Sequence, residues 1–482
     1  MASLEELKKV RLEKLDKIRE KGLDPYPAKV KRTHTLEELQ NKYLPLSIFK
    51  RSVTVVGRIM SLRGQGAVAF VDLYDGTGSF QAFFKKGDTD LKFFKEVIDE
   101  SDFVQVTGTL FKTKKGQRSI AVKEWKIISK SLQPVPDGFY GLKDDDERYR
   151  RRYLDILLNP KTHEMIKQKS IFWNSFRNFL LKEDFVEVQT PVLENTAGGA
   201  DARPFITHHN TLDIDMYLRI SGGELWQKRL MIAGVPRTFE IGRIFRNEGM
   251  SNEHLNDYTQ IEFYQAYNDY ENGMKMVMDL YRTVAKETFG KTKFEINGEE
   301  VDLAKKWEMY DFVEILKNRF GVDVLEADVE ELKKVLSGAN IRFKGDINKE
   351  KATDMLWKNI RGEFVGPGFL INVPVFLEPL AKKNEGGKTV QRFQVILGGS
   401  EMGKGFSELN DPVDQNERFQ HQDALREAGD DEAQMNDNEY VEAMEYGMPP
   451  AFGFGISERL FSVLSGKNIR ETTIFPMMRP KD

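Results

Sequence analysis

Five short runs of alternating apolar and polar residues fill positions 52–130, and they constrain the fold more than any other feature of the sequence. The runs are SVTVVGRIMSLR, AVAFVDLYD, SFQAFF, DFVQVTGTLF and SIAVKEWKII, with the turn signals DGTG and KKGQ between successive runs. Alternation with period two is typical of half-buried strands. We therefore expect a small OB-type barrel over residues 51–131, a fold that often offers aromatic side chains to nucleic acid bases. An ordinary antiparallel β-domain is the alternative.

Charged segments flank this barrel on both sides. Residues 1–50 begin with an amphipathic helical pattern carried by Leu4, Leu7, Leu12, Leu15 and Ile18. Residues 132–152 have the prolines, glycines and charges of a linker. From residue 153 to residue 482 the pattern is mixed, which predicts an α+β domain. Its expected helices lie near 162–182, 273–288, 327–337 and 412–427, and its expected strands near 185–189, 214–220, 237–243, 259–266, 369–373, 390–397 and 451–456.

The composition excludes several classes of protein. No run approaches the ~18 apolar residues of a membrane span, and the N-terminus lacks the apolar block of a signal peptide. We therefore expect a cytoplasmic protein with no membrane partner. The sequence contains no cysteine, which excludes disulfides and cysteine zinc sites and leaves oxygen ligands for any metal. A net charge of −4 argues against binding nucleic acid over the whole surface, although the basic stretch at 112–118 could still face phosphates.

Residues 237–264 concentrate charged and polar side chains in a strand–loop–strand pattern. Period two places Glu262 and Tyr264 on one face of the returning strand, where a half-buried strand usually has Val or Leu. A solvated sheet face is the alternative. The fragment FRNEG in this segment resembles motif 2 of the class II aminoacyl-tRNA synthetases, FVEVQTPVL at 185–193 resembles motif 1, and GFGISERL at 453–460 resembles motif 3. The resemblance implies a catalytic domain built on an antiparallel sheet with flanking helices.

Longer matches at 198–221, 223–230, 406–415, 429–433 and 469–480 are similar to the bacterial-type, class IIb lysyl-tRNA synthetases. This resemblance implies an enzyme that makes lysyl-adenylate from lysine and ATP and transfers lysine to the 3′ end of its tRNA. It also implies a homodimer with Pro191 of motif 1 at the interface. An aspartyl- or asparaginyl-type synthetase is the nearest alternative, and Glu262 with Glu408 opposes it. A non-catalytic tRNA-binding paralogue is a second alternative, and the presence of Arg246, Glu248 and Arg459 opposes it.

The resemblance also assigns roles to individual residues. Arg246 and Arg459 are the expected catalytic residues, because a planar guanidinium binds phosphate in fork geometry and stabilises charge as the carboxylate attacks phosphorus. The expected ATP contacts are Arg246, Glu248, His254, Tyr258 and Arg459. The expected lysine contacts are Glu224, Arg246, Glu262, Tyr264 and Glu408. In the barrel, the expected anticodon contacts are Arg63, Phe70, Gln81 and Glu124, with Phe70 stacking on a base.

Magnesium is the expected cofactor, with Glu401 as its protein ligand. Where similar enzymes have a second metal-binding glutamate, this chain has Gln394, and a neutral carbonyl oxygen should weaken the site. Where they commonly have asparagine near the substrate ammonium, it has Lys404, which could neutralise phosphate or pair with Glu401. Residues 398–405 also fit the start of a P-loop, but they end in Gly405 where a P-loop needs Ser or Thr.

Overall fold

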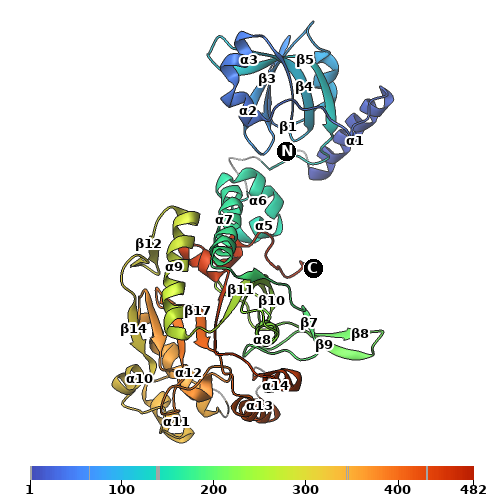
Figure 1. Ribbon diagram of the computed structural model, residues 1–482. Coiled ribbons are helices and arrows are strands. Elements are labelled where there is room, and N and C mark those ends of the chain that lie inside the picture. Colours follow the sequence, from blue (N-terminus) through green and yellow to red (C-terminus); the bar gives the residue numbers. More distant parts are fainter. Residues whose placement is uncertain are drawn as a thin grey trace. The chain divides into compact units, whose positions relative to one another are not determined.

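The computed structural model describes residues 3–64, 66–136, 142–343, 345, 347–429 and 433–481. The chain divides into two compact units, Met1–Asp145 and Asp146–Asp482, which are described separately below (Figure 1). Residues 137–141 of the predicted linker lie outside the described residues. The end of that linker forms helices α5 (Asp145–Arg150) and α6 (Arg152–Leu158). The second unit therefore begins before the predicted start at residue 153.

The first unit is a closed five-stranded barrel of order β1-β2-β3-β5-β4. Buried and partly exposed side chains alternate along most of each strand, as expected for a pleated strand with one face in the core. The predicted OB-type barrel is confirmed. Its elements are β1 (Ser52–Arg63), β2 (Val68–Tyr74), β3 (Ser79–Lys85), α4 (Leu91–Val97), β4 (Phe103–Lys112) and β5 (Arg118–Ser129).

Three helices precede the barrel: α1 (Leu4–Glu20), α2 (Leu36–Asn41) and α3 (Tyr43–Ile48). Helix α1 begins with a capping box between Ser3 and Glu6. The predicted apolar face is only partly correct, because Leu15 and Ile18 are buried together with Arg11, whose guanidinium donates to backbone carbonyls. The other three leucines of the predicted face are exposed, namely Leu4, Leu7 and Leu12.

The second unit is built on an eight-stranded sheet of order β14-β15-β16-β17-β18-β11-β10-β6. Neighbouring strands are antiparallel except in the outermost pairs, β14 with β15 and β10 with β6. The strands are β6 (Val186–Glu187), β10 (Arg237–Phe245), β11 (Asp257–Ala266), β14 (Glu308–Asp311), β15 (Gly368–Ile371), β16 (Arg392–Leu397), β17 (Ser400–Ser407) and β18 (Ala451–Ser457). Residues 398–405 thus complete a β-hairpin in the sheet, and no P-loop is present there.

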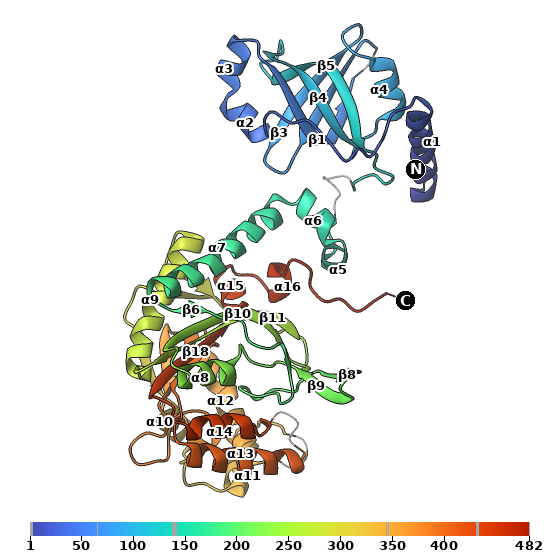
Figure 2. The same cartoon turned by 45° about the vertical axis from the view of Figure 1, so that its right-hand side comes forward.

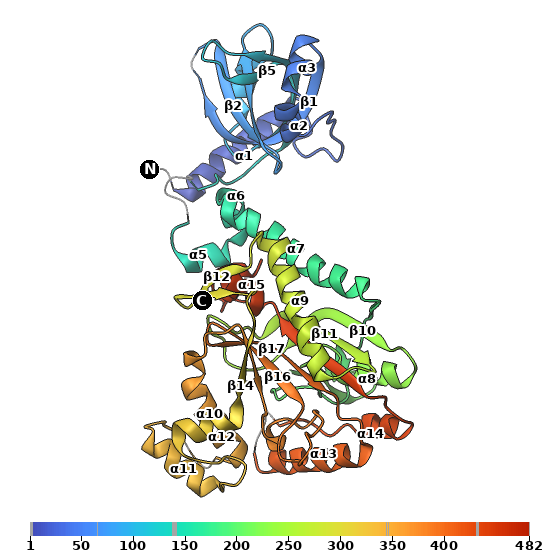
Figure 3. The same ribbon diagram turned by 60° about the vertical axis from the view of Figure 1, so that its left-hand side comes forward.

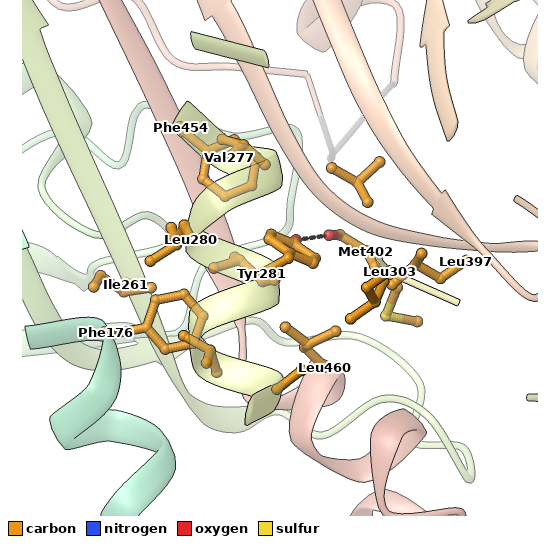
Figure 4. Packing of buried hydrophobic residues seen from close by; sticks show 14 of the residues in the cluster. Phe176, Ile261, Val277, Leu280, Tyr281, Leu303, Leu397, Met402, Phe454 and Leu460 are labelled. Carbon is orange, nitrogen blue, oxygen red and sulfur yellow. Dashed lines mark hydrogen bonds between the residues drawn. The ribbon is translucent and has the colours of Figure 1, made fainter. Parts of the chain in front are cut away.

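Helices α7 (Pro160–Lys182) and α9 (Tyr270–Phe289) cover one face of this sheet (Figures 2 and 3). Ile261 of β11 and Phe454 of β18 pack with Leu280 of α9 in the core between the layers (Figure 4). The buried hydroxyl of Tyr281 donates a hydrogen bond to the carbonyl of Met402 on β17, which fixes the helix to the strand beneath it. Because the apolar residues of β11 take this face, its charged residues must point to the opposite face.

A second hydrophobic cluster packs on that opposite face and takes its residues from α8 and α10 to α14. The helices are α8 (Glu224–Ile232), α10 (Phe312–Phe320), α11 (Val329–Gly338), α12 (Lys349–Ile360), α13 (Pro412–Glu427) and α14 (Asn438–Glu445). No described helix combines the length and the apolar character that a membrane span requires. The remaining elements are β7 (Leu193–Glu194), β8 (Ile206–His209), β9 (Ile214–Leu218), β12 (Lys293–Ile296), β13 (Glu299–Asp302), η1 (Arg361–Glu363), η2 (Val375–Leu377), α15 (Arg459–Leu464) and α16 (Ile469–Thr472).

Candidate active site

A cavity of about 650 Å³ lies on the face of the sheet opposite α9. With the exception of Glu408, every residue predicted to contact ATP, lysine or metal lines this cavity. They come from the β10–β11 hairpin, the start of α8, strands β16 and β17, and the start of α15. These residues are Glu224, Arg246, Glu248, His254, Tyr258, Glu262, Tyr264, Gln394, Glu401 and Arg459.

The floor of the cavity is a row of paired residues across four neighbouring strands. Gln394 pairs with Lys404, Lys404 with Gly455, and Gly455 with Glu262. Cross-strand partners share a face of the sheet, so the three side chains point into the cavity from one row. Gly455 has no side chain. It therefore leaves open space between the ammonium of Lys404 and the carboxylate of Glu262.

The carboxylate of Glu262 is held by three hydrogen bonds. The backbone N–H of Gly222 and the amide of Gln260 donate to Oε1 at 2.6 and 2.5 Å, and the hydroxyl of Tyr264 donates to Oε2 at 2.9 Å. A Cβ added at Gly222 would lie 2.8 Å from Cγ of Glu262, so only glycine fits there. Burial and the nearby carboxylate of Glu224 raise the pKa of Glu262 to about 7. The Glu262 carboxylate is thus held in place to accept hydrogen bonds from an ammonium or another N–H donor.

Glu408 lies behind the cavity wall and is 1% exposed. Its Oε2 is 2.5 Å from the Nζ of Lys228, and the same Nζ is 2.8 Å from Oε1 of Glu224. No described residue donates a hydrogen bond to Oε1 of Glu408. A Cβ added at Gly453, which lines the cavity, would lie 2.1 Å from that oxygen. Burial raises the pKa of Glu408 to about 8, and Lys228 opposes the rise.

The loop after β10 positions Arg246. Its backbone N–H donates to the carbonyl of Asn256 at 2.8 Å, and the Asn256 amide donates back to the carbonyls of Arg246 and Glu248. The guanidinium donates to the Ile220 carbonyl at 3.3 Å and lies 5.9 Å from the ring centroid of Tyr258. The motif 2 arginine is therefore anchored beside an aromatic ring that also lines the cavity.

His254 lies further along this loop, with its ring Nδ1 2.9 Å from the hydroxyl of Ser251. Desolvation by the surrounding walls lowers the pKa of His254, and the guanidinium of Arg361 adds to this effect while the carboxylate of Glu248 opposes it. The imidazole is therefore neutral at neutral pH and offers hydrogen bonds.

Arg459 begins α15 and reaches the cavity from the side of motif 3. Its guanidinium forms an ion pair with Glu253 on the exposed motif 2 loop and donates to the backbone carbonyl of Glu401 at 3.4 Å. Burial lowers the pKa of Arg459 to about 10, so the side chain remains cationic at neutral pH. Two fixed guanidinium groups, from motifs 2 and 3, thus line one cavity.

The two predicted metal positions contact protein donors in this structure. The Oε1 of Glu401 accepts from the indole of Trp357 at 2.7 Å, and Oε2 lies 3.3 Å from the Arg361 guanidinium. The side-chain oxygen of Gln394 accepts from Arg392 at 2.6 Å. Both positions are therefore occupied by donors, and the described residues contain no group of three or more metal-ligating side chains.

Lys404 pairs with a residue that the sequence did not single out. Its Nζ is 3.1 Å from Oε2 of Glu378, whose Oε1 is 2.8 Å from Nε of Arg392. Lys404 therefore does not pair with Glu401. The lysine instead belongs to a cluster of two cations and one carboxylate on the wall beyond Gln394.

In the barrel, three of the four predicted anticodon residues gather around Asp72. Arg63 donates to Asp72 at 2.6 Å, Gln81 pairs with Asp72 across β2 and β3, and Phe70 pairs with Arg63 across β1 and β2. Phe70 also lies 5.0 Å from the ring of Phe83, measured between centroids. Glu124 is separate from this cluster: it pairs with Thr107 on β4, whereas the β5 residue opposite Gln81 is Ser119.

Several residues of these sites escaped the sequence interpretation. The cavity also contains Gln260, Glu378 and Arg392, which no motif marked. Lys228 could have been found, because it follows Glu224 by four residues on a helix, a spacing that brings an acid and a base together. The predicted interface residue Pro191 is exposed and lies between the edge strand β6 and β7.

Comparisons with known proteins agree with this architecture. Residues 144–479 match the class II tRNA synthetases (D, K and N), and residues 53–128 match the OB-fold nucleic acid binding domain. A resemblance was also found in the sequence at residues 429–433, of which residues 430–432 lie outside the described residues. Lysine–tRNA ligases from Fervidobacterium nodosum, Pelotomaculum thermopropionicum and Thermotoga maritima are 41%, 40% and 40% identical over 99% of this chain and 95%, 96% and 97% of their own lengths. The chain therefore belongs to the class II tRNA synthetases and, among them, to the family of the lysine–tRNA ligases.

Proposed function

We propose that this chain activates lysine with ATP and transfers the lysyl group to the 3′ end of tRNA. The observation that carries this proposal is the charge of the pocket. Glu224 and Glu408 pair with one internal cation, Lys228, and Glu262 lies near the carboxylate of Glu224. The raised pKa values of Glu262 and Glu408 leave these two carboxyl groups partly protonated in the free pocket. When a cationic ligand binds and all four groups are ionised, three carboxylates less one ammonium give two negative charges. Buried charge without a partner is costly, so the pocket favours a ligand with two positive groups.

Lysine supplies those two groups, its α-ammonium and its ε-ammonium. An aspartate side chain would add a third negative charge to the two net negative charges of the pocket, and an asparagine side chain would add no charge. This balance favours lysine over the substrates of aspartyl- and asparaginyl-type synthetases. Glu262, Tyr264 and Glu408 are proposed to receive the ε-ammonium and Glu224 the α-ammonium, with Arg246 near the carboxylate.

ATP is proposed to bind between the two guanidinium groups of Arg246 and Arg459. One carboxylate oxygen of lysine attacks the α-phosphorus, and pyrophosphate leaves. Fixed guanidinium groups stabilise the charge on the phosphate oxygens in the transition state, and catalysis needs no covalent enzyme intermediate. The partner of Arg459 in the free enzyme, Glu253, is on an exposed loop, and we propose that phosphate replaces it. By resemblance, His254 lies near the phosphates, while Tyr258 and Glu248 contact adenine.

Magnesium is proposed to enter with ATP. The oxygens of Glu401 and Gln394 accept hydrogen bonds or ion pairs from Trp357, Arg361 and Arg392, so the phosphates and water are the remaining oxygen ligands. The ion is thus treated as part of the nucleotide substrate.

The barrel is proposed to bind the anticodon through the cluster of Arg63, Phe70 and Gln81. An unpaired base can stack on an aromatic ring for roughly 1–3 kcal/mol, while its edges stay free for hydrogen bonds. The polar groups beside Phe70 in the described structure are suited to those edges. Glu124 stays a prediction from the resemblance, since the register of β5 pairs it with Thr107.

A homodimer is proposed to form through motif 1. The exposed apolar side chains of this region come from α7, from the segment around Pro191, and from the β8–β9 hairpin, which projects from the unit in Figures 1 and 2. Edge strand β6 also presents unpaired backbone groups. The exposed apolar residues are Ile171, Leu181, Val186, Val192, Leu193, Ile206, Leu212 and Ile214.

The test of the amino-acid assignment is ATP–pyrophosphate exchange measured with each of the standard amino acids. We expect exchange with lysine alone; arginine, which also carries two positive groups, tests whether the pocket selects the shape of the side chain as well as its charge. Faster exchange with aspartate or asparagine would favour the related synthetases. Absence of exchange with every amino acid, from protein that still binds tRNA, would favour a non-catalytic paralogue.

A further inference from the structure

Lys228 is an internal ammonium inside a pocket proposed to receive an ammonium. Its side chain is 0% exposed, and the carboxylates of Glu224 and Glu408 contact its Nζ at 2.8 and 2.5 Å. The ring centroids of Phe406 and Tyr264 lie 5.4 and 5.9 Å from Nζ. Helix α8 places it one turn after Glu224. It lies behind the cavity and does not line it.

Stability alone does not explain this arrangement. A buried ion pair often contributes no more stability than a well-packed apolar residue of the same size, because desolvation offsets the attraction. Moreover, the pairing of Glu408 is one-sided: Oε2 contacts Lys228, while no described residue donates to Oε1, the oxygen next to Gly453 of the cavity floor. The carboxylate is thus paired through one oxygen, and the other oxygen lies next to Gly453 of the cavity lining.

We propose that Lys228 is a positioning residue that orients Glu408 and favours its ionised form, so that Oε1 stays free for the ε-ammonium of the substrate. This inference rests on the proposed function. Lys228 is not a catalytic residue, since it acts on the substrate through Glu408.

The groups around Glu408 explain why it needs an internal cation. Burial raises the pKa of Glu408, and the like charges of Glu224 on α8 and Glu262 on β11 raise it further. The phenols of Tyr264 on β11 and Tyr440 on α14 also interact electrostatically with this carboxylate.

Among the groups around Glu408, Lys228 has the opposite effect and lowers the pKa. Burial would lower the pKa of Lys228 itself, but Glu224 and Glu408 outweigh burial and raise it. The ammonium therefore stays charged, and its removal would raise the pKa of Glu408 further.

The test is the pH dependence of lysine recognition in Lys228→Met. The KM for lysine is measured by ATP–pyrophosphate exchange and expressed as the ratio of variant to wild type, which cancels titration of the lysine substrate. We expect a ratio of about ten or more near pH 7 that falls toward one near pH 9, because Glu408 ionises again as pH rises. The KM for ATP should change less than threefold. A raised ratio that does not vary with pH would show a structural role and overturn the inference.

Two further variants keep the test decisive. Lys228→Arg retains the charge, so its ratio should vary little with pH. If Lys228→Met does not fold, the comparison of E408Q with the double variant K228M/E408Q replaces it. Lys228 should then have no ionised Glu408 to act on, so the KM ratio of the two variants should not vary with pH, although a constant loss can arise through Glu224. A ratio that still falls toward one as pH rises would contradict the inference.

The barrel offers a matched control. Lys130 is also 0% exposed and lies 2.7 and 2.8 Å from Asp99 and Asp102. Lys130→Met removes a buried lysine between two carboxylates without touching the amino-acid pocket, so it should leave the lysine KM unchanged at every pH. If the wild type shows no lysine-dependent pyrophosphate exchange, the proposed function is refuted. If the wild type is active but the KM ratio of Lys228→Met does not vary with pH, this inference alone is refuted.

Discussion

Glu408 is the single residue on which lysine selection should depend most. It is buried, its Oε2 forms an ion pair with Lys228, and its Oε1 has no partner among the described residues. In Glu408→Ala the substrate ammonium loses a partner in a desolvated site, which costs about 3–5 kcal/mol, or at least hundreds-fold in kcat/KM for lysine. Pyrophosphate exchange at varied lysine measures the loss. Glu439→Ala, which removes an exposed carboxylate in α14, should have no effect, and a loss below tenfold in Glu408→Ala would remove Glu408 from the pocket.

Gln394 should tune the magnesium requirement of the reaction. The chain is expected to require magnesium, at a higher half-saturating concentration than Gln394→Glu, because a carboxylate adds a charged oxygen ligand. Arg392 contacts this position and would compete for the new carboxylate, so the shift should be a few-fold at most. Titration of magnesium in exchange assays of both proteins measures it. An unchanged curve would show that position 394 does not act on the metal.

Lys404 provides a second test on the same wall of the cavity. Because its ammonium pairs with Glu378 and not with the lysine-binding carboxylates, Lys404→Asn should leave lysine as the preferred amino acid. The same exchange assay with lysine, aspartate and asparagine shows the preference. A switch of substrate would place Lys404 in the selection of the side chain.

At the scale of elements, strands β2 and β3 should bind tRNA independently of the catalytic sheet. Phe70→Ala removes a stacking face from β2 and should weaken aminoacylation through tRNA binding, at roughly 1–3 kcal/mol for one base. Pyrophosphate exchange should stay nearly unchanged, since it needs only the cavity of the other unit. Phe93→Ala is the control, because this aromatic residue lies on α4, where Trp125 stacks on it. An equal loss of both activities in Phe70→Ala would make Phe70 structural.

For the whole molecule, we expect a homodimer of the 55.6 kDa chain. Its interface should include the edge strand β6 of motif 1. Sedimentation at micromolar concentration should give twice the monomer mass. Val186→Asp puts a charge on edge strand β6 and should shift the equilibrium toward monomer. Met309→Asp puts the same charge on an exposed apolar residue of the opposite edge strand, β14, and should leave the dimer intact. A wild-type monomer would refute the proposed assembly.

The sequence by itself determined the features that depend on neighbouring residues. Period two identified the barrel strands and placed Glu262 and Tyr264 on one face of β11, because the pleat alternates side chains within a single strand. The resemblance to motifs 2 and 3 pointed to Arg246 and Arg459, which both line the cavity. Helices near 162–182, 273–288 and 412–427 were correct within a few residues, since apolar periodicity is also local to the chain.

Tertiary structure decided the contacts between residues far apart in the chain. Glu408 meets Lys228, 180 positions away, and Lys404 meets Glu378 across a cavity wall instead of the nearby Glu401. Strand register separated Glu124 from the other anticodon residues. Periodicity specifies which face of a strand is buried, but register and packing between distant elements specify which groups share a site. The partners of charged residues therefore became visible only in the folded chain.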